Sequence, residues 1–235
     1  MTQPLAGPSL LVPDTLPVPP PSVPITLARL SGLFRRDFSD AVARVLIGGL
    51  FLALSIRIAR DFLATGRTTG LLLLASELLV VVLTVIRRPA SVVDRRWHAR
   101  LVTAISIAGP LVVRPATTGG LLADGCTAAI SACGLFIVIV AKLSLGRSFG
   151  VMPANRGIIC SGLYRIVRHP IYAGYVITDT GFLLAHPTWW NAVALVGADV
   201  ALVVRALYEE RTLGADAAYA DYLGRVRWRI VPGVF

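Results

Sequence analysis

Two short stretches of the sequence hold most of the residues that could carry out chemistry. The first, residues 162–174, reads Gly-Leu-Tyr-Arg-Ile-Val-Arg-His-Pro-Ile-Tyr-Ala-Gly and combines the imidazole of His169 with the phenols of Tyr164 and Tyr172. Pro170 predicts that a helix starts there, because proline has no N–H to leave unpaired in the first turn. The free N–H groups and the dipole of such a helix start favour an anionic group of a ligand.

The second stretch, residues 205–213, reads Arg-Ala-Leu-Tyr-Glu-Glu-Arg-Thr-Leu. Arg205 and Glu209 are four residues apart, so they share one face of a helix, and Glu210 lies on the adjacent face. Spacing alone favours a salt bridge between Arg205 and Glu209, with a binding site as the alternative. A carboxylate accepts hydrogen bonds from an amine or a ribose hydroxyl, whereas an arginine can hold a carboxylate through two parallel hydrogen bonds.

The composition predicts that these stretches belong to a helical membrane protein. Of the 235 residues, 55% are hydrophobic and 15% are charged, whereas about one quarter of a soluble domain is charged. The formal net charge is +10; a nucleic-acid-binding protein would be basic but not this apolar. We predict an all-α, polytopic transmembrane bundle of about six spans, each needing roughly 20 residues. They are expected at residues 41–59, 70–86, 99–114, 121–142, 171–186 and 189–207.

The basic residues gather in two loops. Residues 87–100 carry a net charge of +4 and residues 142–168 a net charge of +5, whereas the turns at 115–120 and 187–190 carry none. The positive-inside rule places both basic loops in the cytoplasm, and six spans then place both termini there. The tryptophans at 189–190 stand where an aromatic belt at the outer interface would lie. We therefore expect a multi-pass membrane protein with a pocket on the cytoplasmic side of its C-terminal half.

The chain divides into three parts by composition. Residues 1–26 contain eight of the fifteen prolines and are expected to form a disordered tail. Residues 27–120 are expected to form N-terminal transmembrane helices, and residues 121–235 the catalytic region. The three cysteines make no disulfide framework, and the three histidines are too far apart for a metal site. Three acids fall within apolar segments, where they predict a polar pocket or, as the alternative, a hydrogen bond between helices or a protonated acid: Glu77, Asp179 and Asp199.

The two stretches resemble the isoprenylcysteine carboxyl methyltransferase family and the related phospholipid methyltransferases. The resemblance rests on the Arg-His-Pro-x-Tyr-x-Gly motif within residues 162–174, on Arg205 with the Glu-Glu pair at 209–210, and on a downstream Tyr-x-x-Tyr; it covers residues 142–235. These families are integral membrane enzymes that use S-adenosylmethionine. The resemblance implies methyl transfer to a lipophilic acceptor, with O-methylation of an isoprenylcysteine-type carboxylate as the first expectation. The implied partners are a lipophilic or prenylated substrate and membrane lipid, with no nucleic acid.

The resemblance also implies roles for individual residues. Arg205 would face the methyl-accepting substrate. A carboxylate acceptor is already ionised and needs no general base, whereas a thiol or amine acceptor would need one, for which Glu210 or an intramembrane acid is a candidate. Eukaryotic members have a histidine where this chain has Arg156. The residues expected to hold the cofactor are Arg156, Gly157, Ile158, Ile159, Tyr164, His169, Pro170, Ile171, Tyr172 and Glu209.

Two other functions stay open at this point. An NADPH-dependent membrane reductase of the sterol-reductase type has a similar motif, but such enzymes have an asparagine and a glutamate where this chain has Ile171 and Tyr175. A non-enzymatic membrane protein would use Arg205 and Glu209 only as a structural pair. Binding of S-adenosylhomocysteine would favour the methyltransferase, and binding of NADPH the reductase.

Overall fold

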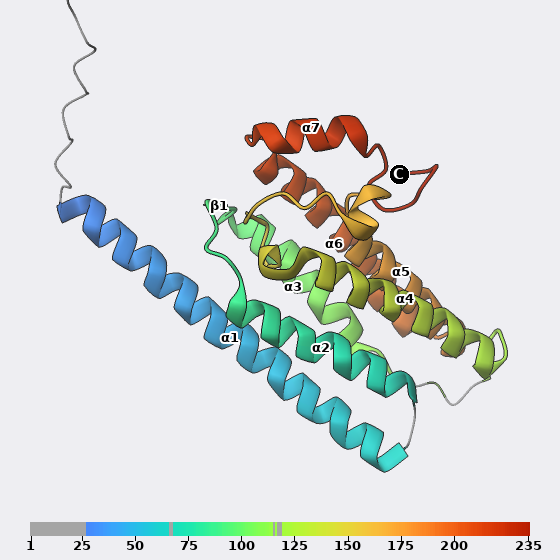
Figure 1. Ribbon diagram of the computed structural model, residues 1–235. Helices are drawn as coiled ribbons and strands as arrows, with labels where there is room; N and C mark the ends of the chain where they lie inside the picture. Colours follow the sequence, from blue (N-terminus) through green and yellow to red (C-terminus); the bar gives the residue numbers. More distant parts are fainter. Residues whose placement is uncertain (1–26, 66–67, 115, 117–118) are drawn as a thin grey trace, which may run out of the picture. The chain divides into compact units, whose positions relative to one another are not determined.

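The computed structural model of the chain describes residues 27–65, 68–114, 116 and 119–235. The proline-rich tail expected at 1–26 lies outside the described residues. Seven α-helices dominate the described part (Figure 1). They are α1 (Leu27–Thr65), α2 (Thr68–Ile86), α3 (Trp97–Val112), α4 (Asp124–Leu145), α5 (Pro170–Ala185), α6 (Trp189–Leu213) and α7 (Ala217–Arg225).

The helical class is confirmed, because each of the six expected helices has a counterpart among α1 to α6. The short helix α7 was not expected from hydropathy. Within the described residues, two helical segments are long and apolar enough to cross a membrane, Asp124–Ser148 and Trp189–Leu213. The count of six spans therefore stays a prediction. The chain divides into residues 1–40 and a compact unit of residues 41–235, and the second unit contains the larger part of α1 together with α2 to α7.

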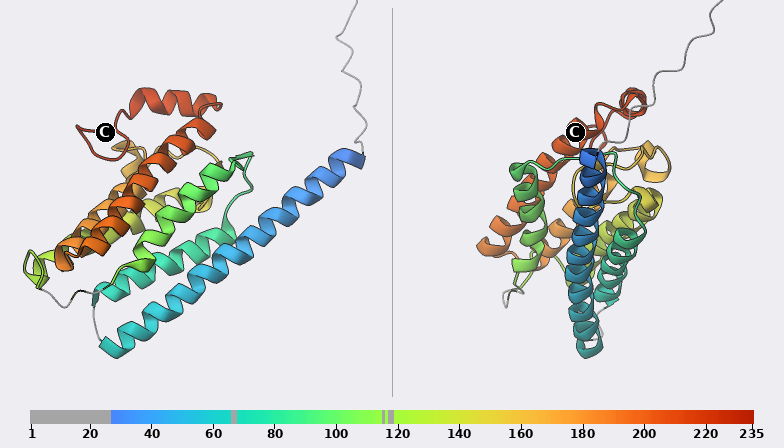
Figure 2. Two further views of the ribbon diagram at one scale, coloured as in Figure 1. Left: turned by 180° about the vertical axis from the view of Figure 1, so that it is seen from behind. Right: turned by 90° about the vertical axis from the view of Figure 1, so that its left-hand side faces the viewer.

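Close contacts through small residues hold the helices of this unit in pairs, with α4 against α5 and α3 against α6 (Figure 2). A methyl group added to Gly174 on α5 would lie 2.7 Å from the backbone oxygen of Gly134 on α4. One added to Gly109 on α3 would lie 2.7 Å from the backbone oxygen of Ala194 on α6. The absent side chains at Gly174 and Gly109 thus allow two helix backbones to touch.

The two basic loops meet at one end of the bundle. Strand β1 (Val92–Val93) pairs antiparallel with β2 (Ala154–Asn155), and the Arg88 N–H donates to the Arg147 carbonyl at 2.7 Å. The turn before α4 meets the end of α5 elsewhere in the unit, where the Leu121 N–H donates to the Leu184 carbonyl at 2.8 Å. The loops therefore share one end, as the charge pattern requires, and its cytoplasmic location stays a prediction.

Candidate active site

The residues expected to bind cofactor and substrate line one cavity, with Pro170 as the exception. The cavity has a volume of about 420 Å³, within the range of sites for small molecules and cofactors. Pro170 is fully buried at the start of α5, where it fixes the beginning of the helix and does not reach the cavity. Residues that are far apart in sequence, such as Arg156 and Arg205, are therefore brought together.

The cavity has a polar part and an apolar part. The polar part lies where α5 begins and α6 ends, and it includes three arginines, a histidine, a glutamate and several tyrosines. Helices α1, α2 and α3 contribute aliphatic side chains to the other part, together with α5 and α6. Examples of this apolar lining are Ile58, Leu73, Ile107, Leu111, Phe182 and Leu195. A ligand with one charged and one hydrocarbon end matches this division.

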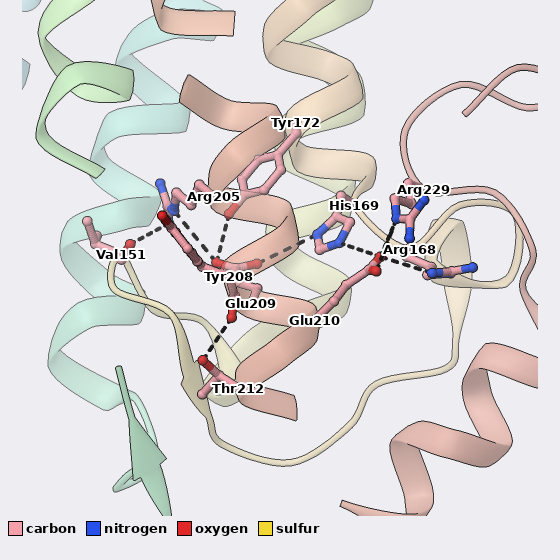
Figure 3. Close-up of polar contacts among 10 residues, drawn as sticks. All are labelled: Val151, Arg168, His169, Tyr172, Arg205, Tyr208, Glu209, Glu210, Thr212 and Arg229. Carbon is pink, nitrogen blue, oxygen red and sulfur yellow. Dashed lines mark hydrogen bonds and ion pairs between the residues drawn. The ribbon is translucent and has the colours of Figure 1, made fainter. Parts of the chain in front are cut away.

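Glu209 is held from three sides in the polar part (Figure 3). The Tyr172 hydroxyl donates to Glu209 Oε1 at 2.7 Å. Arg205 Nε lies 3.6 Å from the same oxygen, and His169 Nδ1 lies 3.6 Å from Oε2. The salt bridge expected between Arg205 and Glu209 therefore forms, and both residues also line the cavity. The structural and the binding interpretations of this pair do not exclude each other.

Arg205 is buried and fixed in place. Its guanidinium donates to the backbone carbonyl of Val151 and lies over the ring of Tyr172, 5.3 Å from the centroid. Among the described residues, no acceptor lies within hydrogen-bond distance of its buried Nε–H. Its nearest carboxylate oxygen, on Glu209, lies 3.6 Å from Nε, so an anionic oxygen in the cavity could accept a shorter hydrogen bond from this buried guanidinium.

His169 lies between two carboxylates at the start of α5. Its ring stacks on Tyr172 at a centroid distance of 5.3 Å and an interplanar angle of 2°. Its Nε2 lies 3.4 Å from Glu210 Oε1, on the opposite side of the ring from Glu209. Burial alone would lower the pKa of His169, but its interactions with Glu209 and Glu210 outweigh burial and raise that pKa above 6.5. The site therefore favours the charged form of His169, in which the imidazolium bridges the two glutamates.

Glu210 does not line the cavity, although the sequence made it a candidate general base. Arg168 Nη1 donates to its Oε1 at 3.0 Å, and Arg229 Nε donates to its Oε2 at 3.0 Å. The two adjacent glutamates point in different directions because successive residues of a helix are rotated by about 100°. Glu210 thus stabilises the wall of the site and is badly placed to take a proton from a substrate.

Two tyrosines of α7 complete the polar part and were not among the expected cofactor ligands. Tyr219 and Tyr222 are three residues apart, so they share one face of α7, and both line the cavity. The Tyr222 hydroxyl donates to the Tyr164 carbonyl at 2.7 Å. The Tyr219 hydroxyl is buried without a hydrogen-bond partner among the described residues. The Tyr-x-x-Tyr motif is the sequence feature that could have placed these two tyrosines at the cavity.

The three acids expected within apolar segments have different places. Glu77 and Asp179 line the cavity, and Asp179 on α5 lies beside Asp199 on α6. Two of the three acids are therefore placed where a polar pocket would have them. The sequence did not predict the surroundings of Lys142, which is fully buried beside Glu77 and donates to Ser76 Oγ at 2.8 Å.

The segment that supplies most of the polar part also matches a known family. Residues 125–219 match the family model described as phospholipid methyltransferase. These residues form a phospholipid methyltransferase domain. A comparison with curated proteins gives no match.

The phospholipid methyltransferase domain begins in α4 and ends in α7, so it contains every residue expected to bind cofactor or substrate. The family supports a membrane methyltransferase, in preference to a reductase or a non-enzymatic membrane protein. Helices α1 to α3, which supply much of the apolar lining, lie outside the matched residues. Arg229, which contacts Glu210, also follows the matched domain.

Proposed function

We propose that the protein transfers a methyl group from S-adenosylmethionine to a lipophilic acceptor, and that an isoprenylcysteine-type carboxylate is this acceptor. The observation that supports the proposal most is the cavity with one charged part and one mostly aliphatic part, which also holds Glu77 and Asp179. The charged part suits a cofactor that carries an ammonium and a carboxylate, and the aliphatic part suits a prenyl chain. The basic loops beside the polar part support a site at the cytoplasmic face of the membrane.

The residues of the polar part fit S-adenosylmethionine. The Glu209 carboxylate can accept hydrogen bonds from its amine or ribose hydroxyls, and the unpaired Tyr219 hydroxyl provides a further buried donor. The faces of Tyr164 and Tyr172 suit adenine or a positively charged sulfonium. Arginine side chains and the start of α5 suit its carboxylate. When bound, the cofactor supplies an electrophilic methyl group.

Arg205 is the residue that aligns the acceptor in this proposal. Its Nε–H, which has no acceptor within hydrogen-bond distance among the described residues, can donate to an acceptor carboxylate. Such a carboxylate is already ionised and needs no general base. Because methyl transfer is an in-line displacement, fixing donor and acceptor next to each other provides much of the rate. The hydrogen bond to Val151 and the ring of Tyr172 hold Arg205 rigidly for this purpose.

The first experiment measures ligand binding and methyl transfer with purified protein in detergent. S-adenosylhomocysteine should raise the melting temperature, because a ligand at 100 times its Kd stabilises the folded state by about 2.7 kcal/mol. Labelled methyl should pass to S-farnesylcysteine as an alkali-labile ester. Label on phosphatidylethanolamine instead would contradict the carboxylate acceptor but keep the methyltransferase. A shift with NADPH and none with S-adenosylhomocysteine would contradict both.

Arg205→Lys tests the assigned alignment. Lysine keeps the charge but loses the forked geometry of the guanidinium, so kcat/KM for the prenylcysteine should fall about tenfold or more. The Kd for S-adenosylhomocysteine should change less than about twofold. Arg211→Lys on the exposed face of the same helix is the matched control and should leave both quantities unchanged. Equal activity of Arg205→Lys and wild-type protein would contradict the role.

A further inference from the structure

Residues 226–235 form a C-terminal tail that runs beside the start of α5. The Arg168 N–H donates to the Trp228 carbonyl at 2.9 Å, and the His169 N–H donates to the Arg229 carbonyl at 2.8 Å. The Arg168 guanidinium donates in turn to the carbonyls of Val226 and Arg227, at 2.9 and 2.7 Å. The tail is therefore hydrogen-bonded to the backbones of Arg168 and His169, which precede α5, and to the side chain of Arg168.

Glu210 joins the tail to the cavity wall through its side chain. Arg229 Nε donates to both carboxylate oxygens, at 3.2 and 3.0 Å, and Arg168 donates to one of them at 3.0 Å. The same carboxylate faces His169 Nε2 at 3.4 Å (Figure 3). A continuous row of charged groups thus leads from Arg229 through Glu210 and His169 to Glu209.

We propose that Arg229 and Glu210 are positioning residues of the methyltransferase site, which fix the imidazole of His169 and through it the Glu209 carboxylate that faces the cavity. Neither lines the cavity, so neither is expected to touch cofactor or acceptor. The inference rests on the proposed function in one respect, namely that Glu209 contacts the cofactor. It adds Arg229, which lies outside the matched family domain, to the machinery of the site.

The charges around His169 explain why this arrangement is effective. Glu210 supports a proton on the imidazole from one side, and Glu209 from the other. Arg168 and Arg229 partly neutralise the Glu210 carboxylate. Glu210 therefore attracts the imidazolium without displacing it from Glu209. Groups from each packed element contribute to this environment. They are Arg168 before α5, Tyr172 on α5, Arg205, Glu209 and Glu210 on α6, Tyr219 on α7 and Arg229 in the tail.

The direct test is the titration of His169 by NMR on full-length protein with 13C-labelled histidine. The sequence has three histidines, so the His169 signal is assigned by its loss in His169→Asn. Glu210→Gln removes one of the two carboxylates, so the pKa of His169 should fall relative to that of wild-type protein. Arg225→Gln, at an exposed position of α7, removes one charge from the same end of the bundle and should leave the pKa of His169 unchanged. An unchanged titration in folded Glu210→Gln would overturn the proposal.

The second test measures S-adenosylhomocysteine binding by calorimetry as a function of pH. Glu210→Gln and Arg229→Gln should each raise the Kd about tenfold near neutral pH. Glu210→Gln should bind almost as tightly as wild-type protein at the acidic end, where His169 is protonated in both. Arg229→Gln leaves Glu210 less neutralised, so the pKa of His169 should rise in this variant. Its Kd should stay raised at acidic pH, because Glu210 then draws the imidazolium away from Glu209. Arg229→Lys keeps the charge and should recover part of the affinity.

The pattern of these results separates the possible failures. Weaker binding in Arg229→Gln together with an unchanged pKa of His169 would indicate a merely structural tail and overturn the positioning role. Wild-type protein that fails to bind S-adenosylhomocysteine at any pH would refute the proposed function instead. The histidine titration would then still decide whether Glu210 controls His169.

Discussion

Single residues around Glu209 fix the direction and the surroundings of its carboxylate in the polar part of the cavity. The carboxylate receives one short hydrogen bond, from Tyr172, and two longer ionic contacts, from Arg205 and His169. The phenol is therefore the group that fixes the direction of the carboxylate most strictly. The charged neighbours maintain its ionisation, while oxygen lone pairs stay available for a ligand in the cavity.

Tyr172→Phe removes this hydrogen bond and leaves the ring in place. We expect the Kd for S-adenosylhomocysteine to rise about five- to tenfold, because the Glu209 carboxylate is no longer fixed in the direction that the proposed cofactor contact needs. The ring of phenylalanine can still stack on His169. The lost hydrogen bond should lower the melting temperature by about 2–4 °C for each kcal/mol lost. Isothermal titration calorimetry on the purified variant measures the Kd, and differential scanning calorimetry measures the melting temperature. Unchanged affinity would show that Glu209 does not need Tyr172 to bind the cofactor.

The histidine between the glutamates also predicts how stability depends on pH. The pKa of His169 is raised above its ordinary value of 6.5, so the folded state binds its proton more tightly than the unfolded state. The resulting stabilisation is complete below about pH 6.5 and is lost as the pH rises through the raised pKa. The melting temperature of wild-type protein should therefore fall across this interval. His169→Asn should show a flatter profile, and a parallel fall in both proteins would contradict the assignment.

The sequence predicted which residues line the cavity better than it predicted which of them contact one another. Pro170 marked the start of α5, and the spacing of Arg205 and Glu209 predicted their contact. Nothing local to the sequence showed that Glu210 turns toward Arg229, because that contact depends on where the tail folds. The lining by aliphatic side chains of α1 and α3 likewise depends on the packing of helices far apart in the chain.

Among the elements, the pair α4 and α5 positions the site, because α5 begins with the residues that line it. The two helices meet at glycines, where a methyl group at Gly134 would lie 2.6 Å from the Gly174 carbonyl oxygen. Hydropathy predicted both helices but not the face by which they pair. Helix α7 was missed altogether, because a nine-residue helix with two buried tyrosines does not form a long apolar run.

Gly174→Ala should separate these helices at the point where α5 leads into the site. The new methyl group would lie 2.7 Å from a backbone oxygen, which cannot move without its helix. We expect a loss of about 1–3 kcal/mol in stability, seen as a lower melting temperature, together with weaker S-adenosylhomocysteine binding. Gly197→Ala on α6 is the control. Nothing lies within 4 Å of its added methyl group, so it should be neutral or slightly stabilising. Equal behaviour of the two variants would contradict the close contact.

At the scale of the whole unit, the arginines explain how the site is oriented. The loop before α3 and the loop before α5 are far apart in sequence, yet β1 and β2 join them at the end of the bundle where the polar part of the cavity lies. A water-soluble cofactor can reach that end from the aqueous phase, whereas a prenyl chain matches the aliphatic lining between the helices. In the proposed function, the charge that would direct insertion and the site that would use the cofactor lie at the same end of the unit.

This arrangement can be tested by labelling single cysteines from either side of the membrane. In a background with Cys126, Cys133 and Cys160 replaced by alanine, Ser91→Cys and Ser161→Cys introduce exposed thiols into the two basic loops. Trp189→Cys introduces one at the start of α6, where the native side chain is 83% exposed. A membrane-impermeant maleimide should label the two loop positions together in inverted vesicles, because the positive-inside rule places them in the cytoplasm.

Trp189→Cys completes the test, because its thiol should be labelled in right-side-out vesicles alone. Helix α6 runs from Trp189 to the site at Glu209, a distance of about 30 Å at 1.5 Å per residue, which matches the hydrocarbon thickness of a bilayer. Labelling of the two loops from opposite sides would contradict the pairing of β1 with β2 in the membrane. Labelling of all three positions from one side would mean that α6 does not cross the bilayer. The proposed site would then need a lipophilic substrate delivered from the membrane surface.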